Sequence, residues 1–318
     1  MTGQKKIRFL VPMTMAAAVG ILLYTLLFPT RAMENIRTSL GIFAFSVLPA
    51  LAVFSVCIKI LIKLGLIGWI SSLPVLKYLR FFGISAGGFT AFLFGVFAGF
   101  PMGAVILSEL CENGEITPEE AASLLPFCNQ AGVSFVVGTV GTSLFGDVRY
   151  GWLLFFAQTA AAATGLLLTA FLRKKTAVMS LRSRPILSPF SAVAAAVSET
   201  AAAMVCVCGF IVFFSLCGEM LGFLCSVLPF DLPQAFPIAI SGFLELSSGI
   251  VPLVSSSFSS IYRLVFCGFL LGFGGFCAFL QAVDRTERFF YTPSFYFLGK
   301  LLQTLLCPLF VLLFVCFL

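Results

Sequence analysis

The chain has 318 residues, of which 60% are apolar and only 10% are charged, and its mean hydropathy is +1.10. Soluble domains carry about 25% charged residues, so this composition excludes a soluble globule and predicts an all-α, polytopic membrane protein. We expect the net charge of +6 to orient the chain in the lipid bilayer, its main partner, rather than to bind nucleic acid.

The composition also argues against an enzyme. The chain has no His, which removes the commonest general base and the Ser-His pair of nucleophilic catalysis. Its eleven Cys are scattered along apolar segments without a CxxC pair, so they are best interpreted as small buried hydrophobes. We therefore predict no metal site and no cofactor.

Apolar segments follow one another along the whole chain. The first, from Phe9 to Phe28, lies after Lys5, Lys6 and Arg8 and is long enough to be a retained spanning helix rather than a signal peptide. The others cover roughly residues 40–62, 83–108, 121–145, 151–172, 190–217, 234–258, 262–283 and 296–318.

Two of these segments are interrupted at matching places in the two halves of the chain. The first breaks at Gly99, Pro101 and Gly103, and the second between Gly242 and Gly249. A broken helix exposes backbone donors and acceptors, and paired breaks of this kind indicate a transporter-like site near the middle of a membrane. The alternative is that both segments are kinked spanning helices.

The basic residues favour two re-entrant hairpins, at 83–110 and 234–258. If all nine segments spanned, 11 of the 19 Lys and Arg would lie inside, whereas two hairpins place 15 inside, with only four outside: Arg31, Arg37, Arg149 and Arg263. We therefore predict about seven spanning helices, a cytoplasmic N-terminus and an inverted repeat. Its parts are a first helix and loop (1–39), repeat 1 (40–172), a basic cytoplasmic linker (173–189) and repeat 2 (190–318).

Four polar side chains are predicted at mid-membrane depth, where burial of such groups is costly. Glu245 lies at the second break, and Glu199 about ten residues into its helix. Asn129 and Gln130 lie at a similar depth, and Ser247, Ser248 and Gly249 follow Glu245. The predicted ligand-binding residues are Gly99, Pro101, Gly103, Asn129, Gln130, Glu199, Glu245, Ser247, Ser248 and Gly249.

Each of these residue types has a function that suits a polar ligand and a simpler structural alternative. The amides of Asn129 and Gln130 can read a base or sugar edge, or they can satisfy the broken backbone. Glu245 or Glu199 can bind a coupling cation or proton, whereas Glu199 can also pack near Lys59 or Lys63.

The loop after the first hairpin carries five Glu and ends in a capping box. Thr117 is the expected N-cap, Pro118 the first helical residue, and Glu120 follows three residues after the cap. These carboxylates are a cation-attracting vestibule or, more simply, a solvated turn.

Four motifs occur in order along the chain: GFPMGAVILSELCENGEITPEEAASLLPFCNQAG (99–132), VGTVG (137–141), GFLELSSG (242–249) and GFGGFCAFLQ (272–281). Together they resemble the YlbJ-type sporulation integral membrane proteins of the nucleoside-recognition or Gate group. That group also includes the spore maturation proteins and the membrane part of the ferrous-iron transporter FeoB. The resemblance covers roughly residues 40–318.

The resemblance implies an endospore-forming bacterium, the cytoplasmic or forespore membrane, a role in spore cortex formation and kinship with concentrative nucleoside transporters. Three positions depart from the family pattern. Gln130 replaces an expected Asn, Val133 an expected Pro and Ser247 an expected Thr. The leading functional hypothesis is a protein that moves or senses a small polar solute, such as a nucleoside. The alternative is a non-transporting sporulation component that acts through partner proteins, as a homo-oligomer or with other sporulation membrane proteins.

Overall fold

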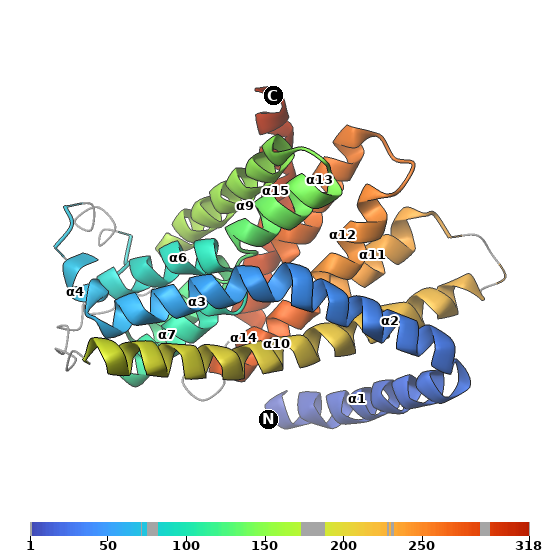
Figure 1. Ribbon diagram of the computed structural model, residues 1–318, viewed down its shortest axis with the longest axis horizontal. Helices are drawn as coiled ribbons and strands as arrows, with labels where there is room; N and C mark the ends of the chain where they lie inside the picture. The colour runs from blue at the N-terminus through green and yellow to red at the C-terminus, as the bar shows by residue number, and fades with distance from the viewer. Residues whose placement is uncertain are drawn as a thin grey trace.

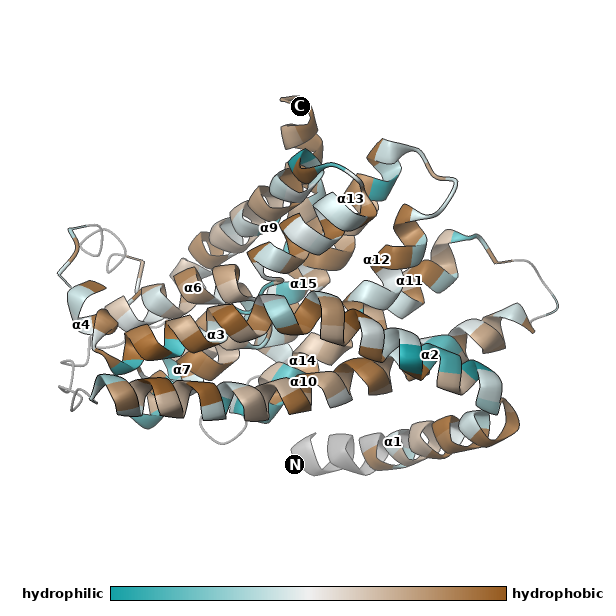
Figure 2. Ribbon diagram, in the orientation of Figure 1, coloured by the Kyte–Doolittle hydropathy of each residue, from teal (hydrophilic) through white to brown (hydrophobic). Residues whose placement is uncertain are grey.

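A computed structural model describes residues 2–70, 72–74, 82–172, 188–227, 229, 232–286 and 293–317 (Figure 1). Every regular element in these ranges is a helix, which confirms the predicted all-α class. Hydrophobic residues run along α3 and α10, whereas hydrophilic residues gather on α2 (Figure 2). Most of the predicted linker 173–189 lies outside the described residues.

The N-terminal part folds as two helical stretches joined by a sharp bend at Phe28. α1 spans Thr2–Leu27, and α2 (Pro29–Ile42) continues through a π-helical stretch η1 (Phe43–Val47) into α3 (Leu48–Lys63). The first stretch turns by 109° at Pro29, which begins the second because proline suits the first helical position. Residues 29–63 are helical throughout, and the division into a first helix and loop (1–39) and repeat 1 (40–172) stays a prediction. The short helix α4 (Leu66–Ile70) follows.

The first interrupted segment forms hairpin 1, made of α6 (Ala86–Ala98) and α7 (Met102–Glu112). Ser85 caps α6 by accepting a hydrogen bond from the Gly88 amide at 3.0 Å. The two helices lie side by side, because a Cβ added at Gly95 would be 3.0 Å from the Gly103 Cα. A kinked continuous helix does not bring these residues together.

The helix after hairpin 1 is also broken, which the sequence did not predict. α8 (Pro118–Cys128) ends at Asn129, and a π-helical stretch η2 (Ser134–Leu144) begins five residues later. The predicted continuous helix over 121–145 is therefore wrong. The predicted cap is confirmed, since Thr117 accepts from the Glu120 amide at 3.2 Å. The side chain of Glu120 instead accepts from the Ser85 amide at 2.8 Å, so it helps to close hairpin 1.

The same order of elements recurs in the second half. α9 (Val148–Leu168) and the 3-10 turn η3 (Thr169–Leu172) end the first half, and α10 (Pro189–Ser226) begins the second. Hairpin 2 consists of α11 (Ala235–Leu244) and α12 (Leu246–Val254). It is followed by a broken pair, α13 (Ser260–Phe273) and α14 (Gly275–Thr286), and by α15 (Pro293–Val315).

In both halves a hairpin, a broken helix and a long helix therefore follow one another. Gly274 and Gly275 make the second break with φ of 83° and 86°, which glycine adopts readily. The inverted relation of the two halves, and the re-entry of the hairpins into a membrane, stay predictions.

Four described helices are long and apolar enough to cross a bilayer: Val148–Leu168, Pro189–Ser226, Ser260–Thr286 and Ser294–Val315. The bent pair of α1 and α2 makes a fifth if it counts as one span. The expected total of about seven stays a prediction, because breaks shorten several of the candidate segments. α10 lies beside α3 on one side, while α9, α13 and α15 pack together on the other (Figure 1).

Candidate functional site

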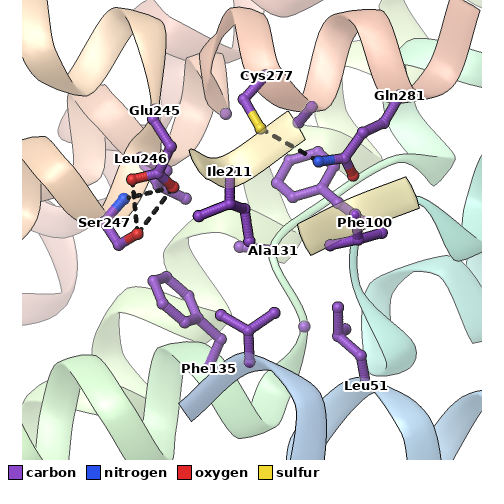
Figure 3. A pocket seen from close by; sticks show the side chains of 15 residues that line it. Leu51, Phe100, Ala131, Phe135, Ile211, Glu245, Leu246, Ser247, Cys277 and Gln281 are labelled. Carbon is purple, nitrogen blue, oxygen red and sulfur yellow. Dashed lines mark hydrogen bonds between the residues drawn. The ribbon is translucent and has the colours of Figure 1, made fainter. Parts of the chain in front are cut away.

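Four breaks contribute residues to one cavity of about 70 Å³: the tips of the two hairpins, the break after α8 and the break between α13 and α14. Hairpin 1 supplies Phe100, hairpin 2 supplies Glu245 to Ser247, and the unwound segment after α8 supplies Ala131 and Gly132. The break between α13 and α14 adds Gly274, and α14 adds further residues (Figure 3). The remaining lining residues are Val47, Leu51, Phe135, Val207, Ile211, Cys277, Ala278 and Gln281.

Glu245 is the acidic residue of this cavity and is only 6% exposed. It is the N-cap of α12, and its carboxylate accepts from the amides of Ser247 at 3.1 Å and Ser248 at 2.7 Å. Both serine hydroxyls also lie within 2.8 Å of it. A negative charge at a helix N-terminus is favourable, so the fold holds this carboxylate at the break in one fixed orientation (Figure 3).

The predicted group around Glu245 is thus brought together, but its members differ in what they face. Ser247 lines the cavity, whereas the Ser248 hydroxyl reaches the Ser215 hydroxyl of α10 at 3.1 Å. Gly249 packs on hairpin 2 itself: a Cβ there would lie 2.3 Å from the Gly242 Cα. Its contribution is therefore close packing of the two hairpin helices.

The predicted residues of hairpin 1 act mainly through backbone packing. A Cβ at Gly103 would lie 2.1 Å from the carbonyl oxygen of Cys128, and one at Gly99 would lie 2.6 Å from the Gly132 amide. Small residues therefore let the end of α8 pass directly against hairpin 1. Gly99, Pro101 and Gly103 do not line the cavity, but they place Phe100 in it.

Asn129 and Gln130 are fully buried beside the cavity rather than in its lining. The Asn129 amide donates to the Tyr296 hydroxyl at 2.9 Å. The Gln130 amide donates to the carbonyls of Pro126 and Phe127, both at 3.2 Å, and to the Gln303 side chain. Gln130 therefore satisfies carbonyls freed by the break, as the alternative interpretation predicted.

Glu199 lies outside the cavity. Its carboxylate, 40% exposed, pairs with Lys59 at 2.7 Å and with Lys63 at 2.8 Å, and Lys59 also pairs with Glu109 of hairpin 1 at 3.0 Å. The predicted ligand role of Glu199 is thus not supported by its position, and the predicted lysine pairing is what the structure contains. The depth estimate missed this because it gave the height of Glu199 along its helix and not the side of the helix.

Two important polar residues were not predicted from the sequence. Gln281 lines the cavity and is 5% exposed; its amide donates to the Cys277 sulfur at 3.2 Å, while its side-chain oxygen has no partner among the described residues. Lys300 is 2% exposed in α15, although the charge argument placed it among the cytoplasmic basic residues. The spacing of Lys300, Gln303 and Thr304 was a usable signal, because it puts three polar groups on one face of an apolar helix.

Comparison with known proteins supports the resemblance found in the motifs. No family model matches the chain. The chain is 25% identical over 317 residues to the sporulation integral membrane protein YlbJ of Bacillus subtilis (strain 168), and the match covers 90% of this chain and 78% of the relative. The predicted resemblance to YlbJ-type proteins is confirmed. The chain is accordingly an integral membrane protein.

Solved structures of CNTnw share the fold. Two variants in an outward-facing state superpose with TM-scores of 0.56 and 0.55, at 15% and 16% identity. These matches cover 96% and 99% of this chain and 85% and 88% of the CNTnw chains. The chain therefore has a transporter-like fold, and none of these names describes an enzyme.

Proposed function

We propose that this membrane protein binds a small polar solute in the cavity at the four breaks and moves it across the membrane or senses it. The observation that carries the proposal is the convergence of four separate breaks on a cavity that contains Glu245. Backbone breaks at membrane depth are tolerated only where protein, water or a ligand satisfies them, and paired breaks are typical of transporter sites.

The lining indicates the chemistry of the solute. Glu245 and the side-chain oxygen of Gln281, which has no partner among the described residues, are both hydrogen-bond acceptors, so they suit a solute with N–H or O–H donors. Phe100 and Phe135 offer apolar and aromatic surface to a flat ring. A nucleoside or nucleobase combines these features, and the shared fold with CNTnw supports that class.

The cavity must widen to admit such a solute. Its volume of about 70 Å³ is small beside the roughly 300–1,000 Å³ of ordinary ligand sites. Phe100 and Glu245 lie at hairpin tips, where a small movement of either hairpin changes the cavity directly. We therefore infer that solute binding is coupled to movement of the hairpins.

The second candidate function is a non-transporting component of sporulation. The similarity to YlbJ favours it, since that relative is named for sporulation and not for transport. In this case the protein acts through partner proteins or a second copy in the cytoplasmic or forespore membrane. The polar residues of the cavity are then dispensable for sporulation.

A thermal-shift screen of the purified protein against nucleosides and nucleobases separates the two candidates. A concentration-dependent rise in melting temperature that Glu245→Gln abolishes supports the solute site. Glu119→Gln, at an exposed position in the first turn of α8, is the control and keeps the response. If no compound raises the melting temperature of the wild-type protein, and cells that carry the Glu245→Gln variant sporulate normally, the solute proposal fails and the partner-based function stands.

A further inference from the structure

The unwound segment after α8 is held by side chains from other helices. The carbonyls freed at this break accept hydrogen bonds from side chains. The Pro126 carbonyl accepts from the Gln303 amide at 3.0 Å, and the Ala131 carbonyl accepts from the Gln158 amide at 2.9 Å. The carbonyl of Asn129 accepts instead from the ammonium of Lys300. Two of these three partners are neutral side-chain amides, and the third is a side-chain cation.

Lys300 is an unusual residue for this position. It is 2% exposed within the apolar helix α15, and no carboxylate of a described residue lies within ion-pair distance of it. Its Nζ lies 5.3 Å from the centre of the Phe100 ring and 6.0 Å from that of Tyr296. Aromatic faces and a carbonyl oxygen attract a cation, so the surroundings of Lys300 are those of a cation site without an acidic ligand.

The position of this site links the break to the cavity. Asn129 supplies the carbonyl to Lys300 and its amide to the Tyr296 hydroxyl, and Tyr296 lies one turn before Lys300 on α15. Phe100, whose ring centre lies 5.3 Å from the ammonium, is the hairpin 1 residue of the cavity lining. The side-chain oxygen of Asn129 is a second acceptor at this point, buried without a partner among the described residues.

We propose that Lys300 is a built-in cation that occupies the carbonyl site at the α8 break in place of a free metal ion. Unwound backbone carbonyls in transporters commonly coordinate a small monovalent cation. Here the ammonium is covalently attached to α15, so the break is satisfied at every salt composition. Sodium therefore has no binding site at this break, and the protein holds hairpin 1 and α15 together without it. This inference concerns the break alone and does not depend on the solute.

The test measures melting temperature in NaCl, KCl or choline chloride at equal ionic strength. The wild-type protein and Lys300→Arg, which keeps the charge, should melt at the same temperature in all three salts. Lys300→Met, which keeps the length but vacates the site, should melt lower in choline chloride. It should recover by about 2–4 °C, saturably, in NaCl, because a bound ion stabilises the folded state.

Lys59→Met is the matched control, since it also removes a buried lysine but one whose partners are the carboxylates of Glu109 and Glu199. It should lose stability without a sodium-specific gain. A folded Lys300→Met protein with no sodium response overturns the proposal. If that variant cannot be purified in any salt, the wild-type protein decides: saturable stabilisation by sodium over potassium and choline refutes a built-in cation, and indifference to all three supports it.

Discussion

The ring of Phe100, at the tip of hairpin 1, packs against Gly274, where α13 gives way to α14 in the other half of the chain. A Cβ added at Gly274 would lie 2.5 Å from the Phe100 Cζ. Both residues line the cavity, so this contact joins the two halves at the candidate site. Gly274 also has a φ of 83°, which is a left-handed conformation. Two separate physical reasons therefore require glycine at this position.

The first prediction concerns Gly274→Ala, which should lower the free energy of unfolding by about 2–5 kcal/mol. Of this, about 1–2 kcal/mol comes from the left-handed backbone and about 1–3 kcal/mol from overpacking against Phe100. Gly146→Ala separates the two contributions, since Gly146 has a φ of 76° and open space around its Cβ position. Thermal melts in detergent measure both variants.

The double variant Phe100→Ala/Gly274→Ala completes this test. Removal of the ring relieves the clash but not the backbone strain, so Gly274→Ala should cost about as much in the Phe100→Ala background as Gly146→Ala costs in the wild type. An equal cost of Gly274→Ala in both backgrounds would show that the Phe100 contact contributes nothing.

The second prediction compares Gln281 with Gln303. The side-chain oxygen of Gln281 has no partner among the described residues, whereas that of Gln303 accepts a hydrogen bond from the Gln130 amide. Gln281→Leu removes an unpartnered acceptor from the cavity, so the fold should keep its stability while solute affinity falls about three- to tenfold. Gln303→Leu removes donors to the Pro126 and Gly299 carbonyls and the acceptor of the Gln130 amide. It should cost about 1–3 kcal/mol of stability.

Thermal melts and solute titrations of the two variants distinguish these effects. A Gln281→Leu protein that is less stable but binds solute normally would indicate that its oxygen has a structural role. In that case the chemistry inferred for the solute would rest on Glu245 alone.

The third prediction uses the ion-pair group that joins α3, α7 and α10. Glu199→Gln should lower stability by about 1–2 kcal/mol, because Lys59 is 5% exposed and, among the described residues, would keep only Glu109 as a charged partner. Lys63→Met should cost less than about 1 kcal/mol, since its pair with Glu199 is partly solvated. Solute binding should be unchanged in both, because neither residue lines the cavity. If Glu199→Gln lost solute binding, Glu199 would have to be counted among the ligand-binding residues.

The sequence predicted the hairpins better than it predicted the broken helices, for a physical reason. The apolar pattern is visibly interrupted at two places. At residues 99–103, Pro101 lies between two glycines, and at residues 242–249, Glu245 lies between two glycines. The break at Asn129 carries no such mark, because its carbonyls are satisfied by Lys300, Gln303 and Gln158 from distant helices. Hydrogen bonds from distant helices stabilise that break, and such tertiary contacts are not visible in the local sequence.

The candidate site divides in the same way. Glu245 and Ser247 were predictable, since a carboxylate followed by two serines at a break is a local N-cap pattern. The direction of a side chain around a long apolar helix was not. Glu199 on α10 therefore proved to pair with lysines, and Gln281 on α14 proved to line the cavity. Height along a helix is readable from the sequence, whereas the side it faces depends on packing.

The fourth prediction concerns membrane topology, which follows from the basic residues and the two hairpins. On a background without native Cys, Cys introduced at Asn113, on the exposed turn after hairpin 1, and at position 178, outside the described residues, should label from the same, cytoplasmic side. Thr38→Cys, on the exposed surface of α2, should label from the opposite side. If positions 113 and 178 label from opposite sides, hairpin 1 and the helices after it cross the membrane differently from the prediction, and the inverted repeat fails with it. Lys300 is buried, so it does not count as a cytoplasmic surface charge, and the number of basic residues that two hairpins place inside falls from 15 to 14. Cysteine labelling tests the topology directly, without a count of charges.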